Sequence, residues 1–310
     1  YFGATSSIEL SQAFSKALSK ILEVNTTFTS PSVASNNFDR TRSLDSVYYA
    51  MFLPQEGARW LGNLKKLKVS GTSVVDQDGQ NAINNDGNIK DNARSFWLPS
   101  DQADDGNLVT AGGTNLILTQ TLNRKVYTDV GSGAPMPLFN KANAVSYAGS
   151  EAALAAYMKT TEGQLDNLFK WALGYDVDDD NGNQITSEKR NDIMGDPLHS
   201  KPLAINYGDG TVRILVGTNG GFVHMFKDSG DSVTEDWSFI PYELYSQLNT
   251  LRENTAATKV YGMDGSPVIY FDDKNDNGIV ITKGVSGIAA IYNDIAKKVT
   301  TDFILIYHAD

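Results

Sequence analysis

The sequence predicts a mainly β protein with some helix. Short runs rich in Val, Thr, Tyr, Phe and Trp recur along the chain, and Gly, Pro, Asn and Asp interrupt them, as expected for strands joined by turns. Helical spacing of apolar residues is confined to a few segments. Because the 310 residues are 41% hydrophobic and 20% charged, the chain can bury a core and form more than one structural unit.

The composition of the chain limits which binding partners and which kinds of metal site can be expected. A formal net charge of −11 would repel phosphate backbones, so we expect no nucleic-acid partner and favour cations instead. The absence of Cys excludes disulfides and thiolate metal sites. No run of about 18 apolar residues is present to form a transmembrane segment. The first residues lack the features of a signal peptide, so we expect a trimmed N-terminus or a fragment of a longer chain.

Residues 1–24 are predicted to hold an amphipathic helix. Ser6 and Glu9 have the spacing of a capping box, and an apolar stripe follows at helical spacing through Leu22. The stripe needs a partner to bury against, so we expect the rest of its domain to lie upstream of Tyr1. The alternative is a local helix that packs on the residues after it.

Residues 25–173 are expected to form a β-rich linking region, with strands at 26–34, 46–53 and 60–69. Within it, residues 70–113 are rich in Asp, Asn, Gly and Gln, which predicts a mobile polar insertion. Its segments 76–79 (DQDG) and 84–87 (NNDG) are expected to be turns, because no later carboxylate completes a binding loop. A helical pair is predicted over 150–172, with Ser150 as the cap of a first helix that ends near Met158.

Residues 174–283 are expected to combine an acidic loop with a partial β-propeller. Four β-like runs, at 201–207, 212–217, 222–226 and 235–240, are separated by Gly-rich turns. Four antiparallel strands joined by tight turns make one propeller blade. Residues 284–310 form an atypical tail without this pattern.

The acidic run that begins at Asp176 predicts a calcium site. Side-chain oxygens fall at every other position before a Gly turn, which is the spacing at which a loop wraps one hard cation. The fit to an EF-hand loop is imperfect, since Asn181 occupies the sixth position and Gly182 comes one residue late. A solvated acidic turn is the alternative. The expected ligands are Asp176, Asp178, Asp180, Gln184 and Glu188.

A second calcium candidate, Asp273, Asn275 and Asn277, matches only the first half of the same pattern. Ile281 and Gly284 occupy positions where oxygen ligands should follow. A plain Asx-Gly hairpin therefore explains this segment better.

No catalytic residues are assigned. Asp196, His199 and Ser200 fall within five residues of one another, whereas a working triad needs its base oriented by one group while it faces a nucleophile on another. We expect Asp196 and Ser200 to form turn and strand-start hydrogen bonds and His199 to be satisfied locally. His224 and His308 are too scattered to make a zinc site without Cys.

Four ordered motifs, at 195–202 (GDPLHSKP), 216–226 (VGTNGGFVHMF), 237–244 (WSFIPYEL) and 261–267 (YGMDGSP), resemble the PilY-type tip adhesins of type IV pili, which include the neisserial PilC adhesins. Upstream, residues 36–40 (NNFDR), 48–54 (YYAMFLP) and 59–66 (RWLGNLKK) are also similar to that family. The resemblance extends from about Thr26 to Val280.

The resemblance implies a quinoprotein-like β-propeller preceded by a von Willebrand factor A-like domain, of which residues 1–24 would be the last helix. It implies a non-enzymatic protein that is exported to the pilus tip, outer membrane or cell surface of a Gram-negative bacterium. Its partners would be minor pilins, the pilus assembly machinery, and a host cell or abiotic surface. Its roles would be pilus extension, attachment and twitching motility, regulated by a calcium loop in or near the propeller.

Two other classes stay open. Quinoprotein-like propellers include oxidoreductases that use pyrroloquinoline quinone, although only one complete blade and part of another can be identified here and the adjacent-Cys ring common among them is impossible. A lectin-like surface module is the other class. Arg190-Asn-Asp stands where relatives sometimes carry Arg-Gly-Asp, so integrin binding is not predicted.

The resemblance fades after Gly278, so we expect a propeller that does not close within this chain. A frameshift, a truncation or a degenerate copy would each explain the tail. We expect an incomplete propeller to leave apolar faces and strand edges open, with poor solubility as the result.

Overall fold

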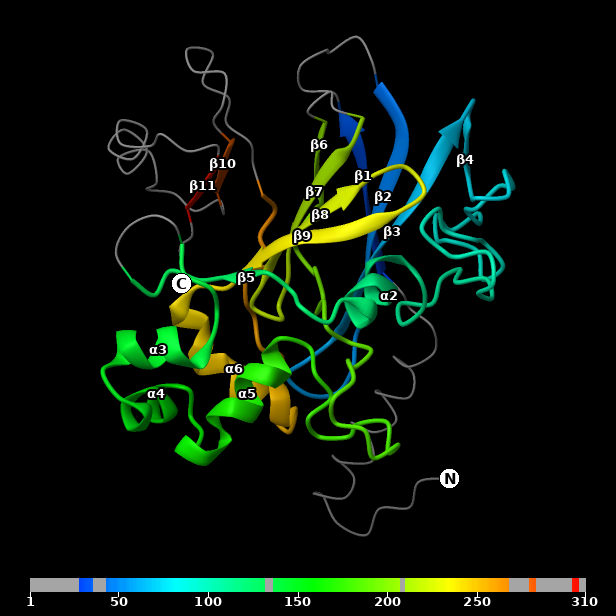
Figure 1. The fold of residues 1–310 in the computed structure, drawn as a ribbon. Helices are drawn as coiled ribbons and strands as arrows, with labels where there is room; N and C mark the ends of the chain where they lie inside the picture. Colours follow the sequence, from blue (N-terminus) through cyan, green and yellow to red (C-terminus); the bar gives the residue numbers. More distant parts are fainter. Residues whose placement is uncertain are drawn as a thin grey trace, which may run out of the picture.

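A computed structural model describes residues 28–35, 43–131, 136–206, 210–267, 279–282 and 303–306 (Figure 1). The predicted helix of residues 1–24, the motif at 36–40, the Asp273–Asn277 candidate and most of the tail lie outside these residues. The described residues form a mixed fold of two sheets and several helices, which agrees with a mainly β protein with some helix. The A-domain remnant and the propeller stay predictions.

The main sheet has nine strands in the order β4-β3-β2-β1-β6-β7-β8-β9-β5. Two antiparallel meanders make up most of it, and they meet where β1 and β6 pair in parallel through Ser35 and Ile205. All seven predicted strands are confirmed, whereas the two short ones, β4 and β5, were not predicted. The bounds are β1 Phe28–Ser35, β2 Ser43–Leu53, β3 Leu61–Ser70, β4 Ser73–Val75, β5 Val126–Tyr127, β6 Leu203–Asn206, β7 Val212–Gly217, β8 Val223–Asp228 and β9 Val233–Phe239. A second, parallel sheet pairs β10 (Ile279–Thr282) with β11 (Phe303–Ile306).

The predicted helical pair is confirmed. Ser150 caps α4, its Oγ accepting a hydrogen bond from the Ala153 amide at 3.0 Å, and α5 begins at Leu165 after a single 3₁₀ turn. Three further helices were not predicted. The bounds are α2 Gly113–Gln120, α3 Lys141–Ala148, α4 Glu151–Tyr157, η1 Glu162–Gln164, α5 Leu165–Ala172, η2 Tyr242–Leu244 and α6 Tyr245–Glu253. Within the described ranges, no helix has the length and apolar character needed to cross a bilayer.

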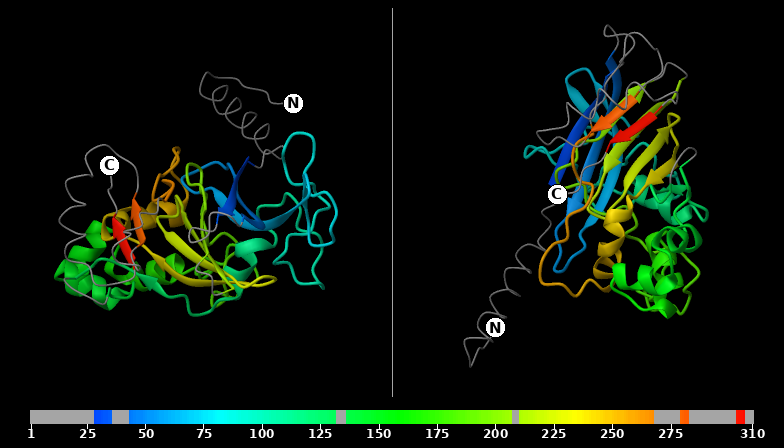
Figure 2. Two further views of the ribbon diagram at one scale, coloured as in Figure 1. Left: turned by 90° about the horizontal axis from the view of Figure 1, so that it is seen from above. Right: turned by 90° about the vertical axis from the view of Figure 1, so that its left-hand side faces the viewer.

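The β6–β9 meander is covered on both faces. Helices α3–α6 lie together beside it (Figures 1 and 2), and Leu168, Phe169 and Tyr245 pack with one face of the strands. The other face packs against β2, β3, α2 and Trp97. Burial of five of the six residues of β7 reflects this double cover. The expectation that an incomplete propeller would leave the faces of this meander open is therefore wrong.

A buried carboxylate of the second meander also contacts side chains of the first half of the chain. Asp228, the last residue of β8, accepts hydrogen bonds from the Tyr48 hydroxyl at 2.6 Å and the Trp97 indole N–H at 3.1 Å. The Lys66 ammonium lies 2.7 Å from the same carboxylate. These three partners come from the first half of the chain, so the junction of the halves does not depend on β1 and β6 alone.

The polar segment after β4 is folded against the outer face of β2 and β3. Ala82, Ile89, Ala93 and Val109 pack there with Tyr49, Met51 and Leu67 in a core of their own, which argues against the mobility expected of the insertion. The two predicted turns are confirmed. The Asp76 carboxylate accepts hydrogen bonds from the amides of residues 78 and 80 at 3.0 and 2.8 Å, and the side-chain oxygen Oδ1 of Asn84 accepts the equivalent bonds from residues 86 and 88 at 3.0 Å each.

Candidate functional site

The acidic loop is closed at its base by backbone hydrogen bonds. Beyond α5 the chain turns at Gly174, which has a positive φ of 97°. The Asp176 amide donates to the Glu188 carbonyl at 2.9 Å, and the Arg190 amide donates to the Gly174 carbonyl at 3.0 Å. Residues 176–188 therefore form a defined loop with both ends fixed, as the acidic run led us to expect.

The five predicted calcium ligands lie on this loop but bind separate partners. Asp176 is buried, and its carboxylate accepts a hydrogen bond from the Asp180 amide at 2.9 Å. Asp178 is held at both oxygens by the Arg252 guanidinium, at 2.6 and 2.8 Å. The Glu188 carboxylate accepts hydrogen bonds from the side-chain amides of Asn181 and Asn183 at 2.5 and 2.7 Å.

Gln184 takes part in the loop through its backbone, whose amide donates to the Asp179 carboxylate at 3.0 Å. Among the described residues, no group of three His, Cys, Asp or Glu side chains is arranged to hold a metal ion. The residues do not fit a calcium site in this arrangement, and calcium binding here stays a prediction.

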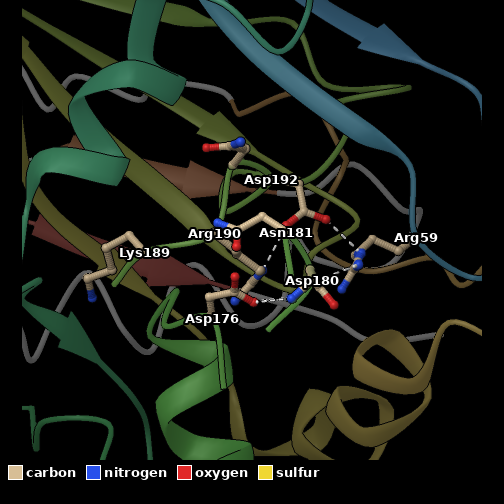
Figure 3. A pocket seen from close by; sticks show the side chains of 8 residues that line it. Arg59, Asp176, Asp180, Asn181, Lys189, Arg190 and Asp192 are labelled. Carbon is tan, nitrogen blue, oxygen red and sulfur yellow. Dashed lines mark hydrogen bonds and ion pairs between the residues drawn. The ribbon is translucent and has the colours of Figure 1, made fainter. Parts of the chain in front are cut away.

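A cavity of about 380 Å³ lies beside the loop (Figure 3). Arg59, which precedes β3, reaches into it and lies 2.8 Å from Asp192 and 3.9 Å from Asp180. Arg190 contacts the other oxygen of Asp192 at 2.8 Å. The cavity wall therefore balances three carboxylates with three cationic side chains. The lining residues are Arg59, Asp176, Asp180, Asn181, Lys189, Arg190, Asn191 and Asp192.

The cationic side chains of the cavity wall differ in how they contact the carboxylates. Figure 3 shows Lys189 apart from the group formed by Arg59, Asp180 and Asp192. Its ammonium donates to the Leu173 carbonyl at 3.0 Å and lies 3.5 Å from the centre of the Tyr175 ring. Burial lowers the pKa of Lys189 to about 8. The arginines therefore supply most of the positive charge that faces the carboxylates.

The carboxylates of the loop also differ in how completely a cationic side chain neutralises them. The hydrogen bonds from Arg252 hold the pKa of Asp178 below its ordinary value. Burial raises the pKa of Asp180, and the neighbouring carboxylates add to this effect although Arg59 opposes it. Asp178 thus has a full counter-ion within the protein, whereas Asp180 has an incomplete one.

Next to the loop, three of the four motifs meet at one side chain. The side-chain nitrogen Nδ2 of Asn219 donates to the Asp196 carboxylate at 2.7 Å and to the Asp264 carboxylate at 2.9 Å, and its side-chain oxygen Oδ1 accepts from the Gly262 backbone amide at 2.9 Å. Asn219 is buried, so these bonds are shielded from water. We call Asp196, Asn219 and Asp264, with the segments that carry them, the motif junction.

Charged side chains complete the motif junction. The Lys259 ammonium binds Asp196, and the His199 ring nitrogen Nδ1 lies 2.7 Å from Asp264. The Ser200 hydroxyl accepts a hydrogen bond from the Gly217 amide at 3.1 Å. The strand-start role expected of Ser200 is confirmed. The local roles expected of Asp196 and His199 are wrong, since the Asp196 carboxylate binds Lys259, 63 residues further along the chain, and His199 meets Asp264, 65 residues further along.

Several residues of these sites gave no signal in the sequence. Arg59 and Arg252 contact the acidic loop from distant segments, and no spacing rule connects them to it. Arg124 and Glu235, which form a fully buried ion pair beside His224, likewise come from separate segments that no spacing rule connects. Asp264 and Asn219 lie inside motifs that the sequence singled out, so the motifs marked the junction without showing which side chains build it.

The comparisons with known proteins point in one direction. The type IV pilus biogenesis factor PilY1 of Pseudomonas aeruginosa (strain UCBPP-PA14) is 23% identical to this chain over 331 aligned positions. The chain is distantly similar to PilY1. The alignment covers 96% of this chain and 25% of PilY1, so the chain spans a quarter of the length of that protein. No protein-family model and no solved structure matches the chain.

Proposed function

We propose that this chain is part of a type IV pilus biogenesis factor of the PilY kind. The observation that carries the proposal is a similarity to PilY1 over 96% of the chain. The motif junction supports it, because three of the motifs that resemble this family are joined through the buried Asn219. Shared motifs that meet in one buried network favour a shared fold over chance similarity.

The finer parts of the proposal follow from the family resemblance. The protein is exported, acts at the pilus tip, outer membrane or cell surface, and contacts minor pilins and the assembly machinery. It supports attachment to a host cell or abiotic surface and twitching motility, and it has no enzymatic activity. The helices and strands of the described residues would then act as a scaffold that presents the acidic loop at the surface.

The proposal is tested by exchange into PilY1. The aligned quarter of PilY1 in Pseudomonas aeruginosa is replaced by this chain, and surface pili and twitching zones are measured. We expect the exchange to retain surface pili. Asn219→Ala within the exchanged part should remove them, while the exposed Asn84→Ala serves as a matched control. Loss of pili in the unmutated exchange, with the protein present at normal levels, would contradict the proposal.

We also propose that the loop at 176–188 responds to calcium. Its support is chemical: Asp176, Asp178, Asp180 and Glu188 put carboxylate oxygens, which calcium prefers, on one closed loop. Calorimetric titration of the chain with calcium chloride tests the idea, with Asp178→Ala and Asp180→Ala as loop variants. The second candidate, Asp273, Asn275 and Asn277, is tested by Asp273→Ala. Heat that is unchanged in both loop variants would count against the loop.

A further inference from the structure

We propose that Asn181 is a site of spontaneous covalent modification, at which the side-chain amide becomes a carboxylate and the acidic loop loses a hydrogen bond. Asn followed by Gly is the sequence most prone to this reaction, deamidation, because Gly has no Cβ to hinder its backbone nitrogen. The described residues include two such pairs, Asn181–Gly182 and Asn219–Gly220, and a third at 277–278 lies outside them. The two described pairs have opposite surroundings.

The reaction needs only water besides the chain itself. The Gly182 backbone nitrogen attacks the side-chain carbon Cγ of Asn181, so that a new N–C bond forms and the bond from Cγ to Nδ2 breaks. Nδ2 leaves as ammonia with the proton of the Gly182 amide, and a cyclic succinimide stays on the chain. Water then opens the ring at either carbonyl, which gives aspartate or isoaspartate, and no group is oxidised or reduced.

The surroundings of Asn181 favour this attack. Asn181, Gly182 and Asn183 are exposed, so water reaches the reacting atoms. The Asn183 backbone amide donates a hydrogen bond to Oδ1 of Asn181 at 3.0 Å, which stabilises the negative charge that develops on this oxygen during attack. The Gly182 amide must first leave its bond to the Asp179 carbonyl, at 3.0 Å. Since this bond closes a surface turn, local opening frees the nitrogen at little cost.

Asn219 is protected by its burial in the motif junction. It is 1% exposed, and its Nδ2, which would have to leave, donates to the carboxylates of Asp196 and Asp264. Deamidation there would place a third carboxylate beside two buried ones, which is costly. The same dipeptide is therefore expected to react at one site and to persist at the other.

The modification changes how the acidic loop is held. Glu188 accepts hydrogen bonds from the side-chain amides of Asn181 and Asn183 at 2.5 and 2.7 Å. A carboxylate at position 181 cannot donate, and its charge repels that of Glu188. Isoaspartate also lengthens the backbone of the turn. We therefore expect the loop to open more readily after deamidation.

Peptide mapping by mass spectrometry tests the site in the whole chain, after incubation in mildly alkaline buffer. The tryptic peptides 171–189 and 214–227 carry Asn181 and Asn219. In the folded chain we expect deamidation to be at least about ten-fold faster at Asn181, and in urea, where burial no longer protects Asn219, the two rates should be similar. Equal rates in the folded chain, or no reaction at Asn181, would overturn the proposal.

A matched pair of Gly variants tests the chemistry. Gly182 and Gly71 have φ values of 71° and 60°, and apart from their chain neighbours no atom lies within 4 Å of where a Cβ would stand. We expect Gly182→Ala to slow deamidation of Asn181 about ten-fold or more, because the added Cβ hinders the attacking nitrogen. Gly71→Ala should leave the rate unchanged. The same rate in both variants would refute attack by the Gly182 nitrogen.

Asn181→Asp, which creates one of the two products, tests the effect on the loop. The amides of Gly182 and Gln184 both donate to Asp179. Their hydrogen exchange should be about three-fold or more faster in Asn181→Asp than in the wild type. Unchanged exchange would show that the modification does not loosen the loop. These results depend on neither calcium nor pili, so they leave the proposed function to its own tests.

Discussion

Two arginine–carboxylate pairs in this chain have nearly the same geometry but differ in their exposure to water. Arg124 holds Glu235 of β9 with contacts of 2.6 and 2.8 Å, and Arg252 holds Asp178 of the acidic loop with contacts of 2.8 and 2.6 Å. The first pair is fully buried within the sheet region, whereas Asp178 in the second is 37% exposed. The difference shows that the geometry of an ion pair does not by itself determine its contribution to stability.

The buried pair specifies the architecture. Glu235 also lies 2.8 Å from His224, so the cluster connects β8, β9 and the segment before β5. Its members cannot separate without leaving a charge out of water, which is costly. The Arg252 side chain is 12% exposed and Asp178 is 37% exposed, so water reaches this second pair, which we call the surface pair, and its net contribution to stability is expected to be small.

The sharpest way to break this comparison is to remove the buried carboxylate. Glu235→Ala leaves Arg124 charged and unpaired in the core, so we expect the free energy of unfolding to fall by about 3–5 kcal/mol. Urea denaturation of the chain measures this. In the double variant Arg124→Ala, Glu235→Ala, the loss should be clearly smaller than the sum of the two single losses, and additive losses would contradict the pairing.

Acid should act on the buried pair in a defined range. Burial opposes ionisation of Glu235, but Arg124 and His224 outweigh it and lower its pKa to about 2 from an ordinary value of 4.5. A carboxyl with a lowered pKa stabilises the fold above its unfolded pKa and loses that contribution as the pH falls. We expect the wild type to lose about 3 kcal/mol more than Glu235→Gln between pH 4.5 and pH 2. Parallel pH profiles would contradict the prediction.

The two turns of the polar segment sharpen the comparison, because they repeat one hydrogen-bond pattern at different burial. Asp76 is 4% exposed and Asn84 is exposed. Asp76→Ala removes a buried acceptor from partly buried hydrogen bonds, so we expect a loss of about 1 kcal/mol or more. Asn84→Ala, whose amides can bond to water, should cost no more than about 0.5 kcal/mol. Equal losses in thermal unfolding would show that burial does not matter here.

The smallest effect is expected for the surface pair. A double-mutant cycle of Arg252→Ala and Asp178→Ala should give a coupling free energy of about 0.2–1 kcal/mol. Added salt should reduce the coupling, because exposed charges are screened. A coupling of the size expected for the Arg124 pair, or one that salt leaves unchanged, would contradict the view that partial exposure makes this pair weak.

Local patterns predicted much of the fold. The β-rich runs gave the seven main strands, since enrichment in β-branched and aromatic residues between turn residues is a local signal. Ser150 gave the start of α4 for a similar reason, because a cap acts within one turn. Helix α2 was missed because it begins at Gly113 with no capping side chain. The burial of β6–β9 on both faces was missed because helices and strands from distant segments provide the cover.

The acidic loop and the motif junction were predictable to different degrees. The loop was located by its carboxylates, but their charge partners Arg59 and Arg252 come from segments on either side that share no pattern with it. The motif junction was located by its motifs, and its bonds could not be derived because Asn219 meets Asp264 across 45 residues. Sequence spacing reports neighbours on one element, whereas both sites are built from contacts between elements.

The span of the motif junction sets an order of events for a newly made chain. Gly195 to Ser200 emerge from the ribosome before Gly262 to Asp264, and the side chain of Asn219 cannot make all its hydrogen bonds until both segments have been synthesised. The earlier strands therefore remain with an incomplete hydrogen-bond network until the later residues have been synthesised. If synthesis stops just before Gly262, the Asn219 side chain should lack its hydrogen bonds to Gly262 and Asp264. Chaperones and proteases can distinguish this form from the complete chain.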